Sequence, residues 1–233
     1  MKKNILFIGG STGIGLETIK LLHDKYNLIV ACRNNENLID LNVTHLKFDV
    51  LNDDLDTEKI PEKLDGFVYF PGSINLRPFR GLKVSTFEED LNINFLSMVK
   101  TLQKVLNNLK KSEKSSVVLY STVAVKIGMP FHSSVSASKG AIEGFAKSIA
   151  AEFAPNIRVN VIAPSLTDTP LASRFLNNDI KKEKVSNKHP LKRYGIANDV
   201  ANSTAFLLSD DSSWVTGQIL GVDGGMSTLN TSN

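Results

Sequence analysis

Short apolar runs alternate with amphipathic stretches along almost the whole chain, and this alternation restricts the fold more than any other feature. Amphipathic segments at about 13–25, 86–109, 132–153 and 197–209 predict helices. Strands joined by long helical crossovers form a parallel sheet covered on both faces. The sequence therefore predicts a doubly wound α/β fold of about seven strands. The expected strands are residues 4–8, 28–32, 45–48, 66–70, 116–121, 157–162 and 218–222.

Local signals suggest where some elements begin and end. Ser85, followed three residues later by Glu88, has the spacing of a capping box and predicts the start of the long helix at residue 86. Pro155 favours an end to the helix before it. Residues 171–194 show no clean periodicity, so we expect an insertion that is either a substrate lid or a plain surface loop. We interpret its lysines as a solvated face.

Length and composition limit the classes of protein to consider. The 233 residues, with 42% apolar and 22% charged side chains, fit one globular domain spanning residues 1–233. A net charge of +3 gives little support for nucleic acid or an anionic membrane as a partner. The apolar run at residues 5–8 is too short for a signal segment or a membrane span. One cysteine, Cys32, and four scattered histidines indicate no disulfide and no zinc site, so we expect a cytoplasmic protein.

A glycine-rich run directly follows the first expected strand and opens into the next helix. Glycine lets the backbone approach a pyrophosphate closely, and a helix N-terminus offers free N–H groups and partial positive charge. A tight turn that binds nothing has the same glycines, but the strand before and the helix after favour a Rossmann-type nucleotide site. Its expected cofactor contacts are Gly9, Ser11, Thr12, Gly13, Ile14 and Gly15.

The end of the second strand indicates which dinucleotide is bound. An acidic residue there would accept from a ribose 2′-hydroxyl, whereas an arginine suits a 2′-phosphate. This chain has Arg33 and Asn34, so we expect NADP(H) in preference to NAD(H), with an exposed surface arginine as the alternative. After the third strand, Asp49 with Val50 could contact the adenine, although a capping Asp in a turn fits as well.

Further stretches form an ordered set with the glycine run. In order and spacing, the set resembles the short-chain dehydrogenase/reductase family over almost the whole chain. The matching residues are Gly9, Gly13, Gly15, Asp49, Asn94 in Asn-Ile-Asn-Phe, the strand Val117 to Thr122, Ser136 to Ala141, Arg158 to Asn160, Ala163-Pro164-Ser165, Val215 to Gln218, and Asp223 to Gly225.

The resemblance implies a nicotinamide cofactor across the carboxyl ends of seven strands, and dimers or tetramers built from the two long helices. Further cofactor contacts implied by it are Gly72, Lys139, Pro164, Thr167 and Thr169. Two departures stand out. The fourth strand ends in Tyr-Phe-Pro-Gly where the family usually has Asn-Asn-Ala-Gly, and Ser165 stands where the family commonly has glycine.

The family's catalytic set is an Asn, a Ser, a Tyr and a Lys. By this resemblance, Asn94 anchors a relay water, Thr122 takes the place of the Ser and holds a carbonyl oxygen, and Lys139 is the Lys. The Tyr lies four residues before the Lys, which in this chain is Val135. Valine has no proton to give, and general acid catalysis is typically worth roughly 10²- to 10⁴-fold in rate.

Other groups near residue 135 could replace the missing acid. His132 has the most suitable unperturbed pKa, although a histidine at a helix start is commonly a partial cap or a surface residue. The remaining candidates are a water ordered by Asn94 and Lys139, or the hydroxyls of Ser133, Ser134 and Ser136.

Two functions from different classes follow. The first is an NADP(H)-dependent oxidoreductase acting on a small carbonyl or alcohol substrate with an atypical proton donor. The second is an NADP(H)-binding protein without catalysis, which serves as a sensor or as a partner subunit. The substitution at Val135 is the reason for keeping the second.

Overall fold

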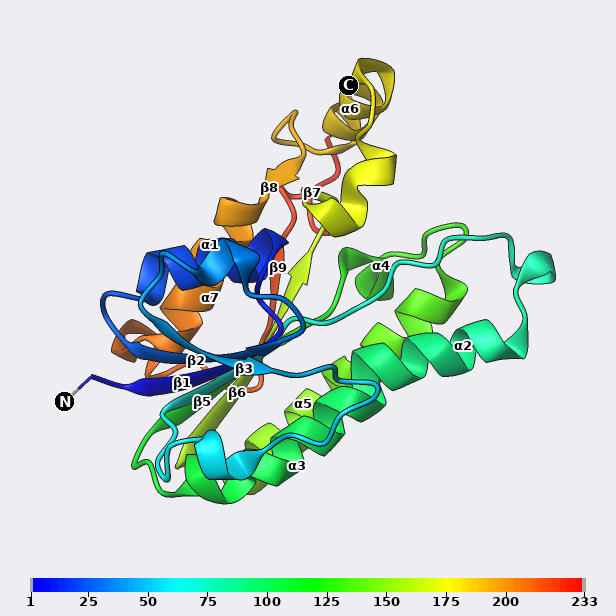
Figure 1. Cartoon of the computed structure of the whole chain (residues 1–233). Coiled ribbons are helices and arrows are strands. Elements are labelled where there is room, and N and C mark those ends of the chain that lie inside the picture. The colour runs from blue at the N-terminus through cyan, green and yellow to red at the C-terminus, as the bar shows by residue number, and fades with distance from the viewer. Residues whose placement is uncertain (1, 232–233) are drawn as a thin grey trace.

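The computed structural model describes residues 2–231, and its centre is one parallel sheet of seven strands (Figure 1). The strand order is β3-β2-β1-β4-β5-β6-β9, so the chain winds outward in both directions from β1. This arrangement confirms the predicted doubly wound α/β fold in a single domain. The strands are β1 (Asn4–Ile8), β2 (Asn27–Cys32), β3 (Val43–Lys47), β4 (Gly66–Tyr69), β5 (Ser115–Tyr120), β6 (Ile157–Pro164) and β9 (Ile219–Val222).

The sheet is covered on both faces because the side chains of its strands alternate between two apolar clusters. In β1, Leu6 and Ile8 belong to one cluster while Ile5 and Phe7 belong to the other. The first cluster packs against α3 (Ser97–Lys110) and α5 (Ser133–Phe153). The second packs against α1 (Gly13–Leu22) and α7 (Ala197–Leu208), which Figure 1 shows together on the opposite side of the sheet.

The long helix predicted over 86–109 consists of three consecutive pieces. Helix α2 (Val84–Leu91) leads into a π-helical turn (Asn92–Leu96), which continues as α3. The predicted capping box is wrong: the helix already starts at Val84, and its N-cap residue Lys83 makes no side-chain cap. π-Turns are frequent at functional sites, and this one carries Asn94.

Residues 171–194 contain structure that periodicity did not predict. A 3₁₀ segment (Pro170–Phe175) is followed by α6 (Asp179–Lys188), which rises above the sheet in Figure 1. The strand β7 (Thr167–Asp168) precedes this segment in the sequence and β8 (Gly195–Ile196) follows it. The two strands pair in parallel as a small ribbon. The ribbon ties the beginning of the insertion to its end.

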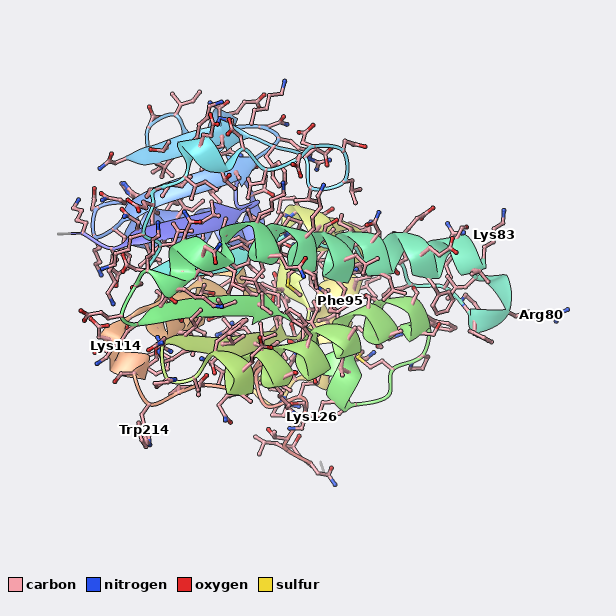
Figure 2. The ribbon with its side chains drawn as sticks, turned by 90° about the horizontal axis from the view of Figure 1, so that it is seen from below. Arg80, Lys83, Phe95, Lys114, Lys126 and Trp214 are labelled. Carbon is pink, nitrogen blue, oxygen red and sulfur yellow. The ribbon has the colours of Figure 1, made fainter. Side chains whose placement is uncertain are left out.

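The face formed by α3 and α5 carries an aromatic contact. Figure 2 shows Phe95 between the helical layer of α2 and α3 and that of α5, and its ring meets Phe145 edge to face at 5.7 Å between centroids. Trp214, in the loop before β9, is 98% exposed. Within residues 2–231, no helix is long and apolar enough to cross a membrane.

Candidate active site

A pocket of about 850 Å³ opens at the carboxyl ends of the parallel strands. Residues that directly follow β1, β2, β4 and β5 line it, together with the end of β6, because parallel strands all end at the same edge of a sheet. All but one of the sequence-predicted site residues lie in its wall. They are Gly9, Ser11, Thr12, Gly13, Ile14, Gly15, Arg33, Asn34, Asp49, Val50, Gly72, Thr122, His132, Lys139, Pro164, Thr167 and Thr169.

The glycine-rich turn is so tight that a Cβ added at Gly13 or Gly15 would press against neighbouring atoms. A Cβ on Gly15 would lie 2.4 Å from the Cα of Gly10, and Gly10 itself has a φ of +112°. A Cβ on Gly13 would come within 3.3 Å of the Thr169 side chain across the pocket. The turn therefore requires glycine for its backbone geometry, and it leaves bare backbone facing the pocket.

The arginine and aspartate singled out from the sequence have different local roles. Arg33 is exposed at the pocket wall, and among residues 2–231 no carboxylate forms an ion pair with it. Asp49 accepts hydrogen bonds from the Leu51 backbone N–H at 3.0 Å and from Asn52 Nδ2 at 3.2 Å, so it caps its own turn. Arg33 remains free to bind an anion, whereas the carboxylate oxygens of Asp49 already accept hydrogen bonds within its own turn.

Thr122, Val135 and Lys139 all line the pocket. The Oγ1 of Thr122 accepts from the Ala124 N–H at the start of the short helix α4 (Val123–Lys126), at 3.3 Å. Its O–H is therefore free to donate. Val135 and Lys139 are one turn apart on α5, so their side chains point from the same face of the helix.

Asn94 is the one predicted site residue that does not line the pocket. It is fully buried behind Gly72, where its Oδ1 would lie 2.9 Å from a Cβ on that glycine. The Nδ2 of Asn94 donates to Ser73 Oγ at 3.0 Å and to the Asp90 carbonyl at 2.8 Å. Both amide hydrogens are thus used inside the protein, and Asn94 holds the loop after β4 in place.

A buried carboxylate that sequence reasoning missed lies beside this asparagine. Asp90 is fully buried on α2, and its Oδ1 accepts from Ser73 Oγ at 2.5 Å and from Asn75 Nδ2 at 2.7 Å. Its Oδ2 is buried without a hydrogen-bond partner among the described residues. The signal was available: Asp90 is four residues before Asn94, at a helix position that faces the core and would ordinarily be apolar.

The ammonium group of Lys139 is the other buried charge in this region. Burial lowers the pKa of Lys139 to about 8, and the negative charge of Asp90 partly opposes that fall. A Cβ on Gly72 would lie 3.5 Å from Lys139 Nζ, so the ammonium lies against the same loop as Asn94. Lys139, which lines the pocket, and the buried Asp90 therefore interact electrostatically.

The alternative proton donors differ in whether they face the pocket. His132 lines the pocket, and its Nδ1 lies 2.7 Å from the Pro130 carbonyl, which can only accept, so Nδ1 carries the hydrogen. Ser133, Ser134 and Ser136 do not line the pocket, and Ser136 Oγ donates to the Ala124 carbonyl at 3.2 Å. Of these candidates, only His132 faces the cavity.

The insertion closes the far side of the pocket. Ser165 Oγ and His189 Nε2 are 2.8 Å apart, and His189 Nδ1 lies 2.8 Å from the Val185 carbonyl. Because that carbonyl can only accept, Nδ1 donates to it, and in the neutral ring Nε2 accepts from Ser165. This contact ties the C-terminal end of α6 to the loop after β6. The lysines Lys181, Lys184 and Lys188 of α6 also line the cavity.

The doubly wound sheet and the glycine-rich turn at its carboxyl edge define the class of Rossmann-type dinucleotide-binding proteins. A family profile described as "Enoyl-(Acyl carrier protein) reductase" matches residues 12–227. The chain belongs to the short-chain dehydrogenase/reductase family of oxidoreductases, whose members use nicotinamide cofactors.

Individual relatives agree with this assignment over nearly full length. The chain is 34% identical to a 3-oxoacyl-[acyl-carrier-protein] reductase of Bos taurus, covering 97% of this chain and 98% of that protein. Its fold is similar to that of aldohexose dehydrogenase of Thermoplasma acidophilum, with a TM-score of 0.89, 25% identity and coverage of 100% and 98%. It is also similar to a variant of ElxO with NADPH bound, with a TM-score of 0.86, 25% identity and coverage of 98% and 100%.

Proposed function

We propose that the protein is an oxidoreductase that transfers a hydride between NADP(H) and a carbonyl or alcohol substrate. One observation carries the proposal: a single pocket brings the glycine-rich turn and Arg33 together with Thr122 and Lys139. A nucleotide-binding surface and groups able to hold a reacting oxygen are thus parts of one site. The oxidoreductases to which the chain is similar support the same class of reaction.

The residues present fit a dinucleotide. Gly13 and Gly15 leave free backbone at the pocket wall, as a pyrophosphate needs, and a Cβ on Gly15 would force the turn to change because it would lie 2.4 Å from the Cα of Gly10. Arg33, exposed and without a carboxylate partner among residues 2–231, suits the 2′-phosphate that distinguishes NADP(H). The NADPH bound to the similar ElxO variant supports the same preference. When bound, the nicotinamide supplies or accepts the hydride.

The remaining cofactor contacts stay predictions that follow from the family's pattern. Asn34, Asp49 and Val50 would contact the adenosine end, while Lys139 would hold the nicotinamide ribose. At the other end of the cavity, Pro164, Thr167 and Thr169 would border the nicotinamide. Every one of these residues is in the pocket wall, which supports the assignment.

Two side chains of the pocket would act on the substrate, and a third, behind the wall, would hold a loop in place. The free O–H of Thr122 would hold the substrate oxygen, Lys139 would orient the site by its charge, and Asn94 would keep the loop at Gly72 in position. Val135 occupies the place that the family pattern gives to tyrosine. A proton donor other than tyrosine is therefore part of the proposal.

A second function is favoured by that same valine. A chain that binds NADP(H) but no longer catalyses would keep the pocket, lose the acid and act as a sensor or a partner subunit. Val135 is buried in the pocket wall, at 5% exposure, so the substitution alters the site itself.

Assembly and location are further predictions. We propose a homodimer or homotetramer built on α3 and α5, as the family resemblance implies, with Leu96, which is 54% exposed, as part of the contact. The segment 171–194 would act as the substrate lid, since its α6 lines the cavity. A cytoplasmic location rests on the one free thiol, Cys32.

The test is NADPH and NADH oxidation by the native protein over a panel of ketones, aldehydes and quinones, with cofactor affinity measured in parallel. Turnover that prefers NADPH and disappears in Lys139→Ala supports the oxidoreductase. Tight NADPH binding without turnover over the whole panel contradicts it and favours the non-catalytic binder. Turnover unaffected by Lys139→Ala would show that the lysine has been assigned the wrong role.

A further inference from the structure

Asp90 is an unusual group to find beneath this pocket. It is completely buried, and its two hydrogen-bond donors, Ser73 and Asn75, both use the same oxygen, Oδ1. The other oxygen, Oδ2, is buried without a partner among residues 2–231. A buried carboxylate with an unsatisfied oxygen is costly unless a positive charge compensates it. A nearby cation would therefore stabilise the charged form of Asp90.

Lys139 is the cation on which the charge of Asp90 acts. Helix α2 packs against α5, and the charge of Asp90 acts on Lys139 across this contact. The lysine is 9% exposed, and its accessible part is in the pocket wall. No hydrogen bond or ion pair within the described chain engages its Nζ, so its N–H groups are available to the cavity.

Position 135 determines what Lys139 can reach. Val135 lies one turn before it on the same face of α5, so no hydroxyl stands between the ammonium and the substrate space. Valine is also shorter than tyrosine, and both Val135 and Lys139 line the cavity that a substrate oxygen or a water would enter. A general acid acts across such a hydrogen bond or through one intervening water.

We propose that Lys139 itself is the proton donor of the reduction, and that Asp90 is a positioning residue whose buried charge keeps that lysine protonated. This inference rests on the oxidoreductase function proposed above and identifies its atypical acid. It differs from the family pattern, in which a tyrosine gives the proton and the lysine assists it.

The step balances without any further reactant. As the carbonyl carbon accepts the hydride, its oxygen accepts a proton from Lys139 Nζ, and the C=O double bond becomes the C–O single bond of an alcohol. The lysine is left as a neutral amine and regains its proton from solvent through the open pocket. In the direction of oxidation, the neutral amine takes the proton from the alcohol.

The protonation of Lys139 suits this role. Burial brings its pKa down to about 8, close to working pH, where a general acid both holds its proton and releases it readily. The titratable groups around it are few. Asp90 faces it from α2, Glu143 follows one turn later on α5 and accepts from Ser121 Oγ at 2.5 Å, and His132 lies in the pocket wall.

The experiment compares the pH dependence of carbonyl reduction in three forms of the full-length protein. In the native protein, the rate should be constant at low pH and fall by about half near pH 8. In Asp90→Asn, which keeps acceptors for Ser73 and Asn75 but removes the charge, the fall should move to lower pH. Glu89→Gln removes a charge from an exposed position on the same helix and should leave the profile unchanged.

A direct titration supplies the second measurement. The ¹³Cε resonance of Lys139, assigned by its absence from Lys139→Arg, should titrate at the same pH as the kinetic fall and move with it in Asp90→Asn. A kinetic fall that stays in place in Asp90→Asn, or that differs from the titration of Lys139, overturns the assignment of the acid while the oxidoreductase stands. No turnover with any substrate, despite NADPH binding, overturns the oxidoreductase as well.

Discussion

Val135 and Lys139 lie one turn apart on α5, and both side chains face the same pocket. The apolar member of the pair is buried at 5% exposure and the charged member at 9%. Burial next to an isopropyl group removes much of the hydration of this ammonium group, and no hydroxyl at position 135 replaces it. Because the residue at position 135 borders the ammonium group of Lys139, a substitution of Val135 tests the acid chemistry of the site.

We predict that Val135→Tyr increases the rate of carbonyl reduction by roughly 10- to 1,000-fold, because a phenol beside Lys139 would have a lowered pKa and would act as a better acid. Steady-state NADPH oxidation measures this effect. Val135→Phe is the matched control, since it adds the same bulk without the hydroxyl. An equal gain in Val135→Phe would attribute the effect to the shape of the pocket.

Arg33 should discriminate between the two cofactors. Loss of a charge-assisted bidentate contact to a phosphate costs about 1.5–3 kcal/mol, so Arg33→Ala should raise the Kd for NADPH roughly 10- to 100-fold. The Kd for NADH should hardly change. Arg80, at the outer tip of the segment before α2 in Figure 2, is the control, and Arg80→Ala should affect neither cofactor. Equal weakening of both cofactors by Arg33→Ala would contradict the 2′-phosphate contact.

The glycine-rich turn should not tolerate a methyl group at position 15. The new Cβ would lie 2.4 Å from the Cα of Gly10, so the backbone of the turn must shift. We expect Gly15→Ala to lower the free energy of unfolding by on the order of 1–3 kcal/mol and to abolish NADPH binding. Urea unfolding and cofactor fluorescence measure the two effects.

Gly144 provides the opposite case in the same protein. It is within α5, is exposed, and has nothing within 4 Å of an added Cβ. Alanine favours helix over glycine by about 0.8–1.0 kcal/mol, so Gly144→Ala should raise the free energy of unfolding without changing the Kd for NADPH. If Gly15→Ala and Gly144→Ala behaved alike, steric contact at the turn would not be the cause.

The buried charge of Lys139 should make stability depend on pH. Because its pKa is lowered in the folded protein, to about 8 from 10.5, the unfolded chain binds more protons between these values. Stability should therefore rise as the pH increases from 8 to 10.5. Relative to Lys139→Met, the native free energy of unfolding should increase by on the order of 3 kcal/mol from pH 7 to pH 10.5. Parallel urea titrations test this, and identical pH profiles would contradict the burial of a charged amine.

The contact between Ser165 and His189 should hold the insertion in place. A hydrogen bond of this type is worth about 1 kcal/mol, so Ser165→Ala should open the segment 171–194 roughly fivefold more often. Trypsin cleavage at the exposed lysines of α6 measures the opening. The control is Ser213→Ala, which changes an exposed position away from the insertion. Equal cleavage of both variants would show that the contact between Ser165 and His189 does not hold the insertion.

The sheet could be predicted from the sequence because each strand is a compact apolar run. Buried parallel strands need such runs on both faces, and the observed strands agree with the predicted ones to within about two residues at most ends. The ribbon of β7 and β8 could not be found in this way. Each of its strands has two residues, which is too short for any periodicity to show.

The site was predictable where a motif has a fixed backbone role and less so where packing decides. Gly13 and Gly15 could be assigned to the pocket from the sequence because the turn after β1 requires glycine at these positions, and both line the pocket. The water-anchoring role expected of Asn94 stays a prediction; packing decides its position, because a π-helical turn places it behind Gly72, where its Nδ2 donates to Ser73 Oγ and to the Asp90 backbone carbonyl. Asp90 belongs to no motif, since it is a single acidic residue that the packing of α2 buries.

The paired strands β7 and β8 also bear on how a chain like this diversifies. Since Thr167–Asp168 is joined to Gly195–Ile196, everything between them departs from the sheet and returns to it at one place. A change in the length of the segment between them would add little loop-closure cost, since its two ends already meet in the ribbon. The part of the pocket wall that this insertion forms can therefore vary in sequence and length, and selectivity for new substrates can evolve there while the central sheet stays the same.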